Sequence, residues 1–212
     1  MSLHAPSGQL FIVSAPSGVG KTTLINRIRS ERPDLCFSVS VTTRSPRPGE
    51  VHGRDYFFIS KEEFIRGVET EAFIEWAQVH GNYYGTYSGQ IRDWLTEGKD
   101  VLLDIDVQGA RQVRCAAPHA WTIFVVPPSL EVLQQRLKRR GTETADQLET
   151  RLAAARAELQ EAAWYDFIVL NDDLQEAVRD FSAILRACRC HRTSRSTVLK
   201  RFVPGETQAI DP

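Results

Sequence analysis

The feature that most constrains this chain is a glycine-rich stretch that separates a short apolar run from a helical pattern. Residues 14–22 read Ser-Ala-Pro-Ser-Gly-Val-Gly-Lys-Thr, between the apolar residues 10–13 and a helix expected over 23–30. A strand, a glycine-rich loop ending in Lys-Thr and a helix together form the phosphate-binding loop of P-loop proteins. The glycines let backbone N–H groups curl around phosphate oxygens, and the helix N-terminus adds partial positive charge. The stretch predicts a site for a nucleotide phosphate, but it does not by itself name a reaction.

Individual residues of this loop have separate expected roles. Lys21 would reach the β- and γ-phosphates, and the Thr22 hydroxyl would ligate Mg²⁺. The general pattern has Gly where this chain has Ala15, but Pro16 favours an extended backbone at Ala15, where a Cβ is tolerated. A chance match in an ordinary glycine-containing turn is the alternative interpretation. The residues of the loop expected to bind the nucleotide phosphates are Ser14, Ala15, Pro16, Ser17, Gly18, Val19, Gly20, Lys21, Thr22 and Thr23.

The order of apolar runs and amphipathic patterns predicts an α/β fold. Strands are expected over residues 10–13, 37–41, 56–59, 73–79, 101–105, 121–126 and 167–170, with a loop at 81–85. Helices are expected over 23–30, 88–97, 130–140 and 145–163, and a last one around Phe181. Because most strands are continuously apolar rather than alternating, they indicate a parallel sheet with helices on both faces.

Residues 37–87 depart from this pattern, since they are rich in short strands, Pro and Gly, and they predict a small β-containing lobe. The core is then expected over 8–36 and 98–187. After residue 187 the chain becomes basic and loses its periodicity, so residues 188–212 are expected to form a solvated tail.

Composition narrows the function classes. The 26 basic and 27 acidic residues nearly balance, so no global charge favours nucleic acid or an anionic membrane as a partner. No apolar run reaches the roughly 18 residues of a membrane helix, and the N-terminus lacks the pattern of a signal peptide. The four cysteines without paired spacing indicate free thiols and a cytoplasmic location. Cys188, Cys190 and His191 are too few for structural zinc, which needs four ligands.

A proline-rich segment carries two arginines. Residues 42–50 read Thr-Thr-Arg-Ser-Pro-Arg-Pro-Gly-Glu, and an extended backbone with three residues per turn would project Arg44 and Arg47 to the same side. Two guanidinium groups so placed suit the binding of one phosphate. Tyr56 follows closely and could donate its hydroxyl to that phosphate. The alternatives are two solvated arginines and a half-buried aromatic residue.

Acidic and basic side chains later in the chain are further candidates for the site. Asp104 and Asp106 end an apolar strand, at the edge where parallel α/β folds bind ligands, although they could also merely cap the next helix. Arg136, Arg139 and Arg140 share one face of an expected helix, and Arg151 begins the next. Such a cluster is usually a solvated helix face.

Several motifs together resemble the guanylate kinase family of bacterial type, the P-loop nucleoside monophosphate kinases that phosphorylate GMP. They are Ser-Val-Ser-Val-Thr-Thr-Arg-Ser-Pro-Arg-Pro-Gly-Glu at 38–50, His-Gly-Arg-Asp-Tyr-Phe-Phe at 52–58, Phe-Ile-Glu-Trp at 73–76, Gly-Asn-Tyr-Tyr-Gly at 81–85, Asp-Ile-Asp-Val-Gln-Gly at 104–109 and Asn-Asp-Asp at 171–173. The resemblance covers residues 8–187. It implies a P-loop NTPase-type core, a GMP-binding lobe over about 37–87, a helical lid over about 136–156, Mg²⁺ as cofactor, and phosphoryl transfer from ATP to GMP.

The resemblance also implies roles for particular residues. On the acceptor side, it implies GMP-phosphate binding by Arg44, Arg47, Tyr56 and Tyr84, guanine reading by Ser40, Glu75 and Thr86, and a place near GMP for Asp106. On the donor side, it implies lid arginines Arg136, Arg140 and Arg151, an adenine contact by Asn171, and Mg²⁺ held through water by Asp104. The residues expected to be catalytic are Lys21, Arg44, Arg136 and Arg151. Tolerance of dGMP and the oligomeric state stay open.

The chemistry of guanine supports Glu75 independently. Guanine presents two adjacent donors, N1–H and the N2 amine, and one carboxylate can accept both. Adenine has an unprotonated N1 there, and a site built on hydrogen bonds rejects such a partner by about 10⁴-fold in favourable cases. Because Tyr83 and Tyr84 are adjacent, they would point to opposite faces of an extended segment, so only one would meet the ligand.

There are two rival functions, the first of which belongs to another class. One is a non-catalytic scaffold domain of the guanylate kinase type, but such domains lose loop residues, whereas Gly18, Gly20, Lys21 and Thr22 are present. The other is a related kinase acting on a sugar phosphate, which would leave Glu75 without a guanine to read.

Overall fold

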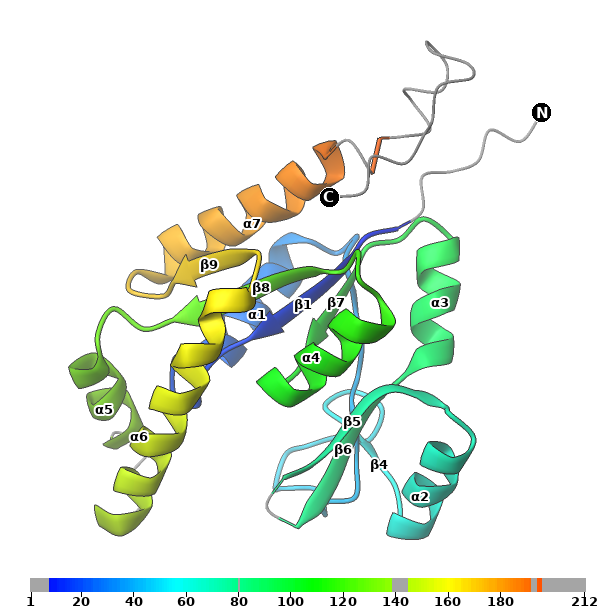
Figure 1. Ribbon diagram of the computed structural model, residues 1–212, viewed down its shortest axis with the longest axis horizontal. Helices are drawn as coiled ribbons and strands as arrows, with labels where there is room; N and C mark the ends of the chain where they lie inside the picture. Colours follow the sequence, from blue (N-terminus) through cyan, green and yellow to red (C-terminus); the bar gives the residue numbers. More distant parts are fainter. Residues whose placement is uncertain (1–7, 80, 139–144, 192–193, 196–212) are drawn as a thin grey trace.

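The computed structural model describes residues 8–79, 81–138, 145–191 and 194–195, and it contains two sheets (Figure 1). The larger sheet has five parallel strands in the order β2-β7-β1-β8-β9. All of the central strand β1 is buried, because it lies between two other strands and helices cover both faces of the sheet. The bounds are β1 Leu10–Ser14, β2 Cys36–Phe37, β7 Val101–Asp104, β8 Trp121–Val126 and β9 Phe167–Leu170.

Helices cover both faces of this sheet, which confirms the predicted α/β fold. On one face, α1 and α7 enclose a buried cluster that includes Phe11 and Phe181. On the other face, α3 and α4 enclose a cluster that includes Ile12 and Phe124. The alternation of Phe11 and Ile12 between two cores explains why the strand is continuously apolar. The helices are α1 Lys21–Glu31, α3 Ser88–Thr96, α4 Val107–Ala116 and α7 Leu174–Cys190.

Two further helices extend past the carboxyl ends of the strands (Figure 1). They are α5 (Leu130–Lys138) and α6 (Ala145–Gln160), and a short 3₁₀ turn, η1 (Glu161–Trp164), follows α6. Leu133 and Ala155 belong to a small buried cluster between them. None of the described helices combines the length and apolar character needed to cross a bilayer.

The second sheet forms the predicted lobe, with strand order β4-β3-β6-β5. Phe64 of the helix α2 is fully buried and stacks on Phe73 and Tyr83, at centroid distances of 4.6 and 5.2 Å. The side chains of α2 and the sheet therefore form the core of the lobe. The bounds are β3 Val41–Thr42, β4 Phe57–Phe58, α2 Lys61–Glu69, β5 Phe73–Val79 and β6 Asn82–Tyr87.

The lobe differs from the sequence-based expectation in three respects. The single strand expected over 37–41 is two short strands, β2 and β3, which belong to different sheets because the chain crosses from the core to the lobe between them. The loop expected at 81–85 is largely strand β6, which pairs antiparallel with β5. The helix α2 was not predicted, although Ser60 and Glu63 form a capping box that signals its start.

The last helix is longer than expected. It continues to Cys190, and Cys188 is buried, so the boundary predicted at residue 187 falls inside α7. The remainder of the expected tail lies almost entirely outside the described residues.

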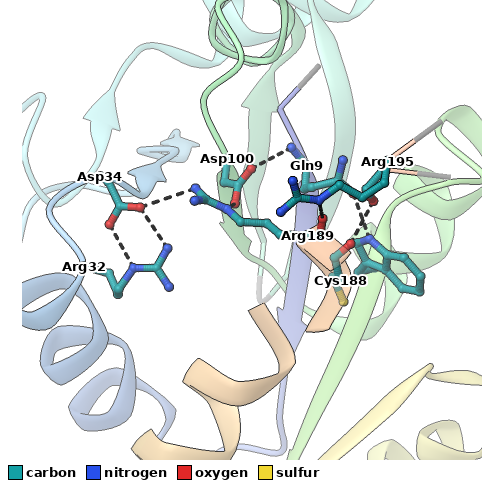
Figure 2. A network of polar contacts seen from close by, with 9 residues as sticks. Gln9, Arg32, Asp34, Asp100, Cys188, Arg189 and Arg195 are labelled. Carbon is teal, nitrogen blue, oxygen red and sulfur yellow. Dashed lines mark hydrogen bonds and ion pairs between the residues drawn. The ribbon is translucent and has the colours of Figure 1, made fainter. Parts of the chain in front are cut away.

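A polar network joins the C-terminal end of α7 to the beginnings of strands β1 and β7 (Figure 2). The buried Asp100 carboxylate accepts hydrogen bonds from the Gln9 backbone at 2.9 Å and from Arg189 Nε at 2.5 Å.

We expect Arg189→Ala to lower the free energy of unfolding by about 2 kcal/mol, because it leaves the buried Asp100 carboxylate without its cation. Chemical denaturation measures the change. The matched control is Arg179→Ala on the same helix, which removes an exposed pair with Glu176 and should change stability by less than about 0.5 kcal/mol. Equal effects of the two substitutions would contradict a structural role for the network.

Candidate functional site

The glycine-rich loop joins β1 to α1 as predicted, and its glycines are required by backbone and space. Gly18 and Gly20 have φ angles of 89° and 97°, in the left-handed region that favours glycine. A Cβ at Gly20 would lie 2.7 Å from Asn171 Nδ2, and one at Gly18 would lie 2.5 Å from a methyl carbon of Leu137. Neighbouring elements therefore pack directly against the loop backbone.

The side chains of Asn171 and Arg136 donate hydrogen bonds to the backbone of the glycine-rich loop. Asn171 is buried, and its Nδ2 donates to the Val19 carbonyl at 2.8 Å. Arg136 Nη1 donates to the same carbonyl at 2.9 Å and to the Asn171 carbonyl at 3.0 Å. These two predicted donor-side residues thus bond to the phosphate loop itself. A third, Arg140, lies outside the described residues.

Helix α6 also contacts the loop, at Ser17. Arg151 Nη2 donates to Ser17 Oγ at 2.6 Å. Glu158 lies seven residues later on the same helix; burial raises the pKa of its carboxyl, and the nearby backbone of Ser17 opposes this rise. Within the part of the chain that the structure describes, Glu158 Oε2 is buried without a hydrogen-bond partner. Sequence reasoning missed Glu158; its two-turn spacing from Arg151 was the available signal.

Lys21 begins α1 and points to the end of the neighbouring strand β7. Its ammonium lies 2.6 Å from the Asp104 carboxylate and 3.4 Å from the Ile105 carbonyl. Asp106 caps α4, because its carboxylate accepts the Gly109 N–H at 2.8 Å. The capping role considered for Asp104 therefore belongs to Asp106, whereas Asp104 pairs with the loop lysine.

A cavity of about 310 Å³ lies between the core and the lobe and contains both halves of the predicted site. The core contributes the loop residues that begin α1 and both aspartates, and the lobe contributes a carboxylate, a serine and two tyrosines. Donor-side and acceptor-side residues thus share one space. The lining residues are Lys21, Thr22, Ser40, Tyr56, Glu75, Ala77, Val79, Tyr84, Gly85, Asp104, Ile105 and Asp106.

Glu75 is a buried carboxyl at the edge of this cavity, with only 5% of its surface exposed. Thr86, opposite it on β6, donates its hydroxyl to Glu75 Oε1 at 2.5 Å. Burial raises the pKa of Glu75 to about 7, against the lowering effect of the Thr86 hydrogen bond and with a smaller contribution from the Asp106 charge. A carboxyl held this way by one hydrogen bond is suited to accept further donors from a ligand.

The two arginines of the proline-rich segment occupy different environments. Arg44 donates to the Glu50 carboxylate at 2.9 and 3.0 Å, and its guanidinium lies 5.5 Å from the Tyr56 ring centre. The side chain of Arg47 is exposed, and neither arginine is among the described residues that line the cavity.

A turn explains the position of Glu50, which sequence reasoning missed. The Glu50 N–H donates to the Arg47 carbonyl at 3.0 Å, and Gly49 between them has a φ of 88°. Pro48 and Gly49 are the residue types that a type II turn favours at its centre, and that dipeptide was the available signal. The turn returns the Glu50 carboxylate to the Arg47 N–H and to Arg44.

The paired tyrosines separate as expected. Tyr84 lines the cavity and lies edge-on to Tyr56, with 6.2 Å between ring centres. Tyr83 faces the other way, where it stacks on Phe64 in the lobe core. Of these two adjacent tyrosines, Tyr84 is therefore the one that lines the cavity.

Comparisons with known proteins indicate one family. The family model described as guanylate kinase matches residues 7–188. The guanylate kinase of Dechloromonas aromatica is 48% identical over 181 residues, covering 85% of this chain and 90% of the relative. That of Symbiobacterium thermophilum is 49% identical and covers 87% of each. The crystal structure of guanylate kinase from Anaplasma phagocytophilum is 33% identical, with a TM-score of 0.77 over 95% of this chain and 98% of that one. The chain belongs to the guanylate kinase family.

Proposed function

We propose that the residues around this cavity transfer the γ-phosphoryl group of ATP to GMP, giving ADP and GDP, as the family assignment indicates. The observation that carries the proposal is a single cavity lined on one side by Lys21 and Asp104 and on the other by Glu75 and Tyr84. A phosphate-binding loop and a carboxyl suited to guanine then face the same space.

In this proposal the acceptor side binds GMP in two parts. The Glu75 carboxylate accepts N1–H and the N2 amine of guanine, supported by Thr86 and Ser40. Arg44, Arg47, Tyr56 and Tyr84 bind the GMP phosphate, and Asp106 lies beside it. GMP binding then requires Arg44 to exchange its bond with Glu50 for one with the phosphate, so Glu50 holds the guanidinium in place until GMP arrives.

The phosphoryl transfer itself needs no general base. The second pKa of a phosphate monoester is about 6, so the acceptor oxygen of GMP is already a nucleophile at neutral pH. Catalysis then consists of in-line positioning and of neutralising the charge on the transferred group. We assign that neutralisation to Lys21, with the lid residues Arg136, Arg140 and Arg151, and the adenine contact to Asn171.

Thr22 of the loop and Asp104 at the end of β7 fit a divalent cation, and we propose Mg²⁺. The Thr22 hydroxyl and the Asp104 carboxylate both line the cavity, and oxygen ligands of these kinds suit Mg²⁺, which commonly keeps several waters. When bound with ATP, the cation supplies positive charge at the β- and γ-phosphate oxygens. A cytoplasmic location stays a prediction.

An ADP-release assay with purified protein, Mg-ATP and each of GMP, AMP, CMP and UMP tests the function. GMP should be preferred strongly over the other three monophosphates, because it alone presents two adjacent donors to Glu75. Equal rates with AMP and GMP would remove the role assigned to Glu75, and ADP release that needs no acceptor would remove the kinase assignment.

The pH dependence of the GMP KM should report Glu75. The site needs the ionised carboxylate, and its pKa is about 7, so KM should rise about fivefold as the pH falls from 7 to 6. The GMP phosphate also titrates in this range, so Glu75→Gln is the control. Its KM should keep the effect of the phosphate and lack the part of the rise that comes from protonation of Glu75. Protonation of Glu75 also affects folding. Because the pKa of Glu75 in the folded protein exceeds its ordinary value of 4.5, this group makes the protein less stable as the pH rises from about 4.5 to 7. A wild-type KM profile identical to that of Glu75→Gln would contradict the assignment.

A further inference from the structure

The core helix α4 lies against β5, the edge strand of the lobe sheet (Figure 1). At this contact the side-chain amide of Gln112 pairs with the backbone of Trp76. Gln112 Nε2 donates to the Trp76 carbonyl at 2.7 Å, and Gln112 Oε1 accepts the Trp76 N–H at 3.1 Å. The amide thus satisfies the two backbone groups that an added strand would pair, at the residue that follows Glu75.

One turn earlier on α4, Gly109 lies against the Glu75 side chain. A Cβ built on Gly109 would be 2.5 Å from Glu75 Oε2 and 3.1 Å from Glu75 Cδ. The φ of Gly109 lies outside the left-handed region, so helical backbone conformation alone does not require glycine here. Glycine is required at position 109 because the carboxyl group of Glu75 occupies the space that a Cβ would fill.

The same turn of helix links the two carboxyl groups of the acceptor site. The Gly109 N–H donates to Asp106 Oδ1 at 2.8 Å, while the Cα of Gly109 faces Glu75. The first turn of α4 therefore sets the separation of Asp106, which belongs to the core, from Glu75, which belongs to the lobe. A guanine that contacts both sides depends on this separation.

We infer that α4 positions the guanine-reading carboxylate, with Gly109 as a specificity-determining residue and Gln112 as a positioning residue. The inference rests on the proposed function. Gly109 provides room for the carboxylate through the absence of a side chain, and Gln112 fixes the strand that carries Glu75 to the core. Neither residue touches the transferred phosphoryl group, so both should affect GMP recognition rather than ATP binding.

The test is the GMP and ATP kinetics of Gly109→Ala. An added methyl displaces the Glu75 carboxyl, so the GMP KM should rise at least about tenfold and selectivity for GMP over AMP should fall, with the ATP KM within about twofold of wild type. The matched control is Gly89→Ala in α3, another helical glycine, whose Cβ would meet nothing within 4 Å. Both changes replace Gly by a better helix former.

A double substitution separates this role from general damage. Asp is one methylene shorter than Glu, so the added methyl of Gly109→Ala has room in a Glu75→Asp background. In that background Gly109→Ala should raise the GMP KM by less than about twofold.

Gln112→Glu is a second variant at an exposed site, which keeps the acceptor for the Trp76 N–H but places an oxygen against the Trp76 carbonyl. It should also raise the GMP KM and leave the ATP KM unchanged.

A GMP KM within twofold of wild type for both Gly109→Ala and Gln112→Glu would overturn the inference while leaving the proposed function intact. Equal losses from Gly109→Ala in the wild-type and Glu75→Asp backgrounds would also overturn it. A wild-type protein without GMP-dependent ADP release would instead reject the proposed function.

Discussion

Lys21→Ala is expected to lower kcat by about 10³-fold, because it removes an ammonium group from the position where charge develops on the transferred phosphoryl. Lys21 begins α1 at the end of the phosphate loop, and its ammonium already lies 2.6 Å from Asp104 at the cavity. The substitution should change stability little, since both partners of this pair are partly exposed. ADP release at saturating Mg-ATP and GMP measures the effect.

The matched control is Lys99→Ala, which also removes an ammonium paired with a carboxylate, that of Glu97, but on the surface of the core. Its turnover should equal that of the wild type. Near-normal turnover of Lys21→Ala, in a protein that unfolds at the wild-type temperature, would show that the loop does not serve phosphoryl transfer.

Glu75→Gln should lower kcat/KM for GMP by about 10³-fold and bring the GMP and AMP values within tenfold of each other. A glutamine accepts one guanine donor through its oxygen but turns its own amine toward the other donor, so one hydrogen bond is lost and one contact becomes repulsive. The Thr86 hydroxyl still has an acceptor, and no buried charge is created. Competition between GMP and AMP in one assay gives the ratio directly.

The surface substitution Glu69→Gln, on α2 of the same lobe, serves as the control, because this carboxylate is exposed. It should leave the GMP to AMP ratio unchanged. If Glu75→Gln kept the wild-type ratio, guanine selection would have to come from other residues of the lobe.

The glycine-rich loop was predictable because local sequence determines it. Glycines at positions 18 and 20 adopt left-handed backbone angles that other residues resist, and the buried strand before them is apparent in the sequence. The lobe was harder to predict. Its strands β3 and β4 have two residues each, too few to show a period, and the division of 37–41 between two sheets depends on tertiary pairing.

The acceptor half depended on the resemblance and on the chemistry of guanine, and its supports were not predictable. Gly109 and Gln112 lie more than thirty residues along the chain from Glu75 and Trp76, so no local pattern connects them. The resemblance implied phosphate binding by Arg136, but no pattern in the sequence indicated the hydrogen bonds from its Nη1 to the Val19 and Asn171 carbonyls. Residues that act by holding a loop or a strand have no motif of their own.

The central claim is that ATP and GMP bind on opposite sides of one cavity. An analogue in which adenosine and guanosine are joined by five phosphates would span both sides, and its inhibition can be measured against each substrate. We predict one molecule per chain, competition with both ATP and GMP, and binding at least about 10²-fold tighter than either substrate alone. Competition with only one of the two, or two molecules bound per chain, would contradict the account.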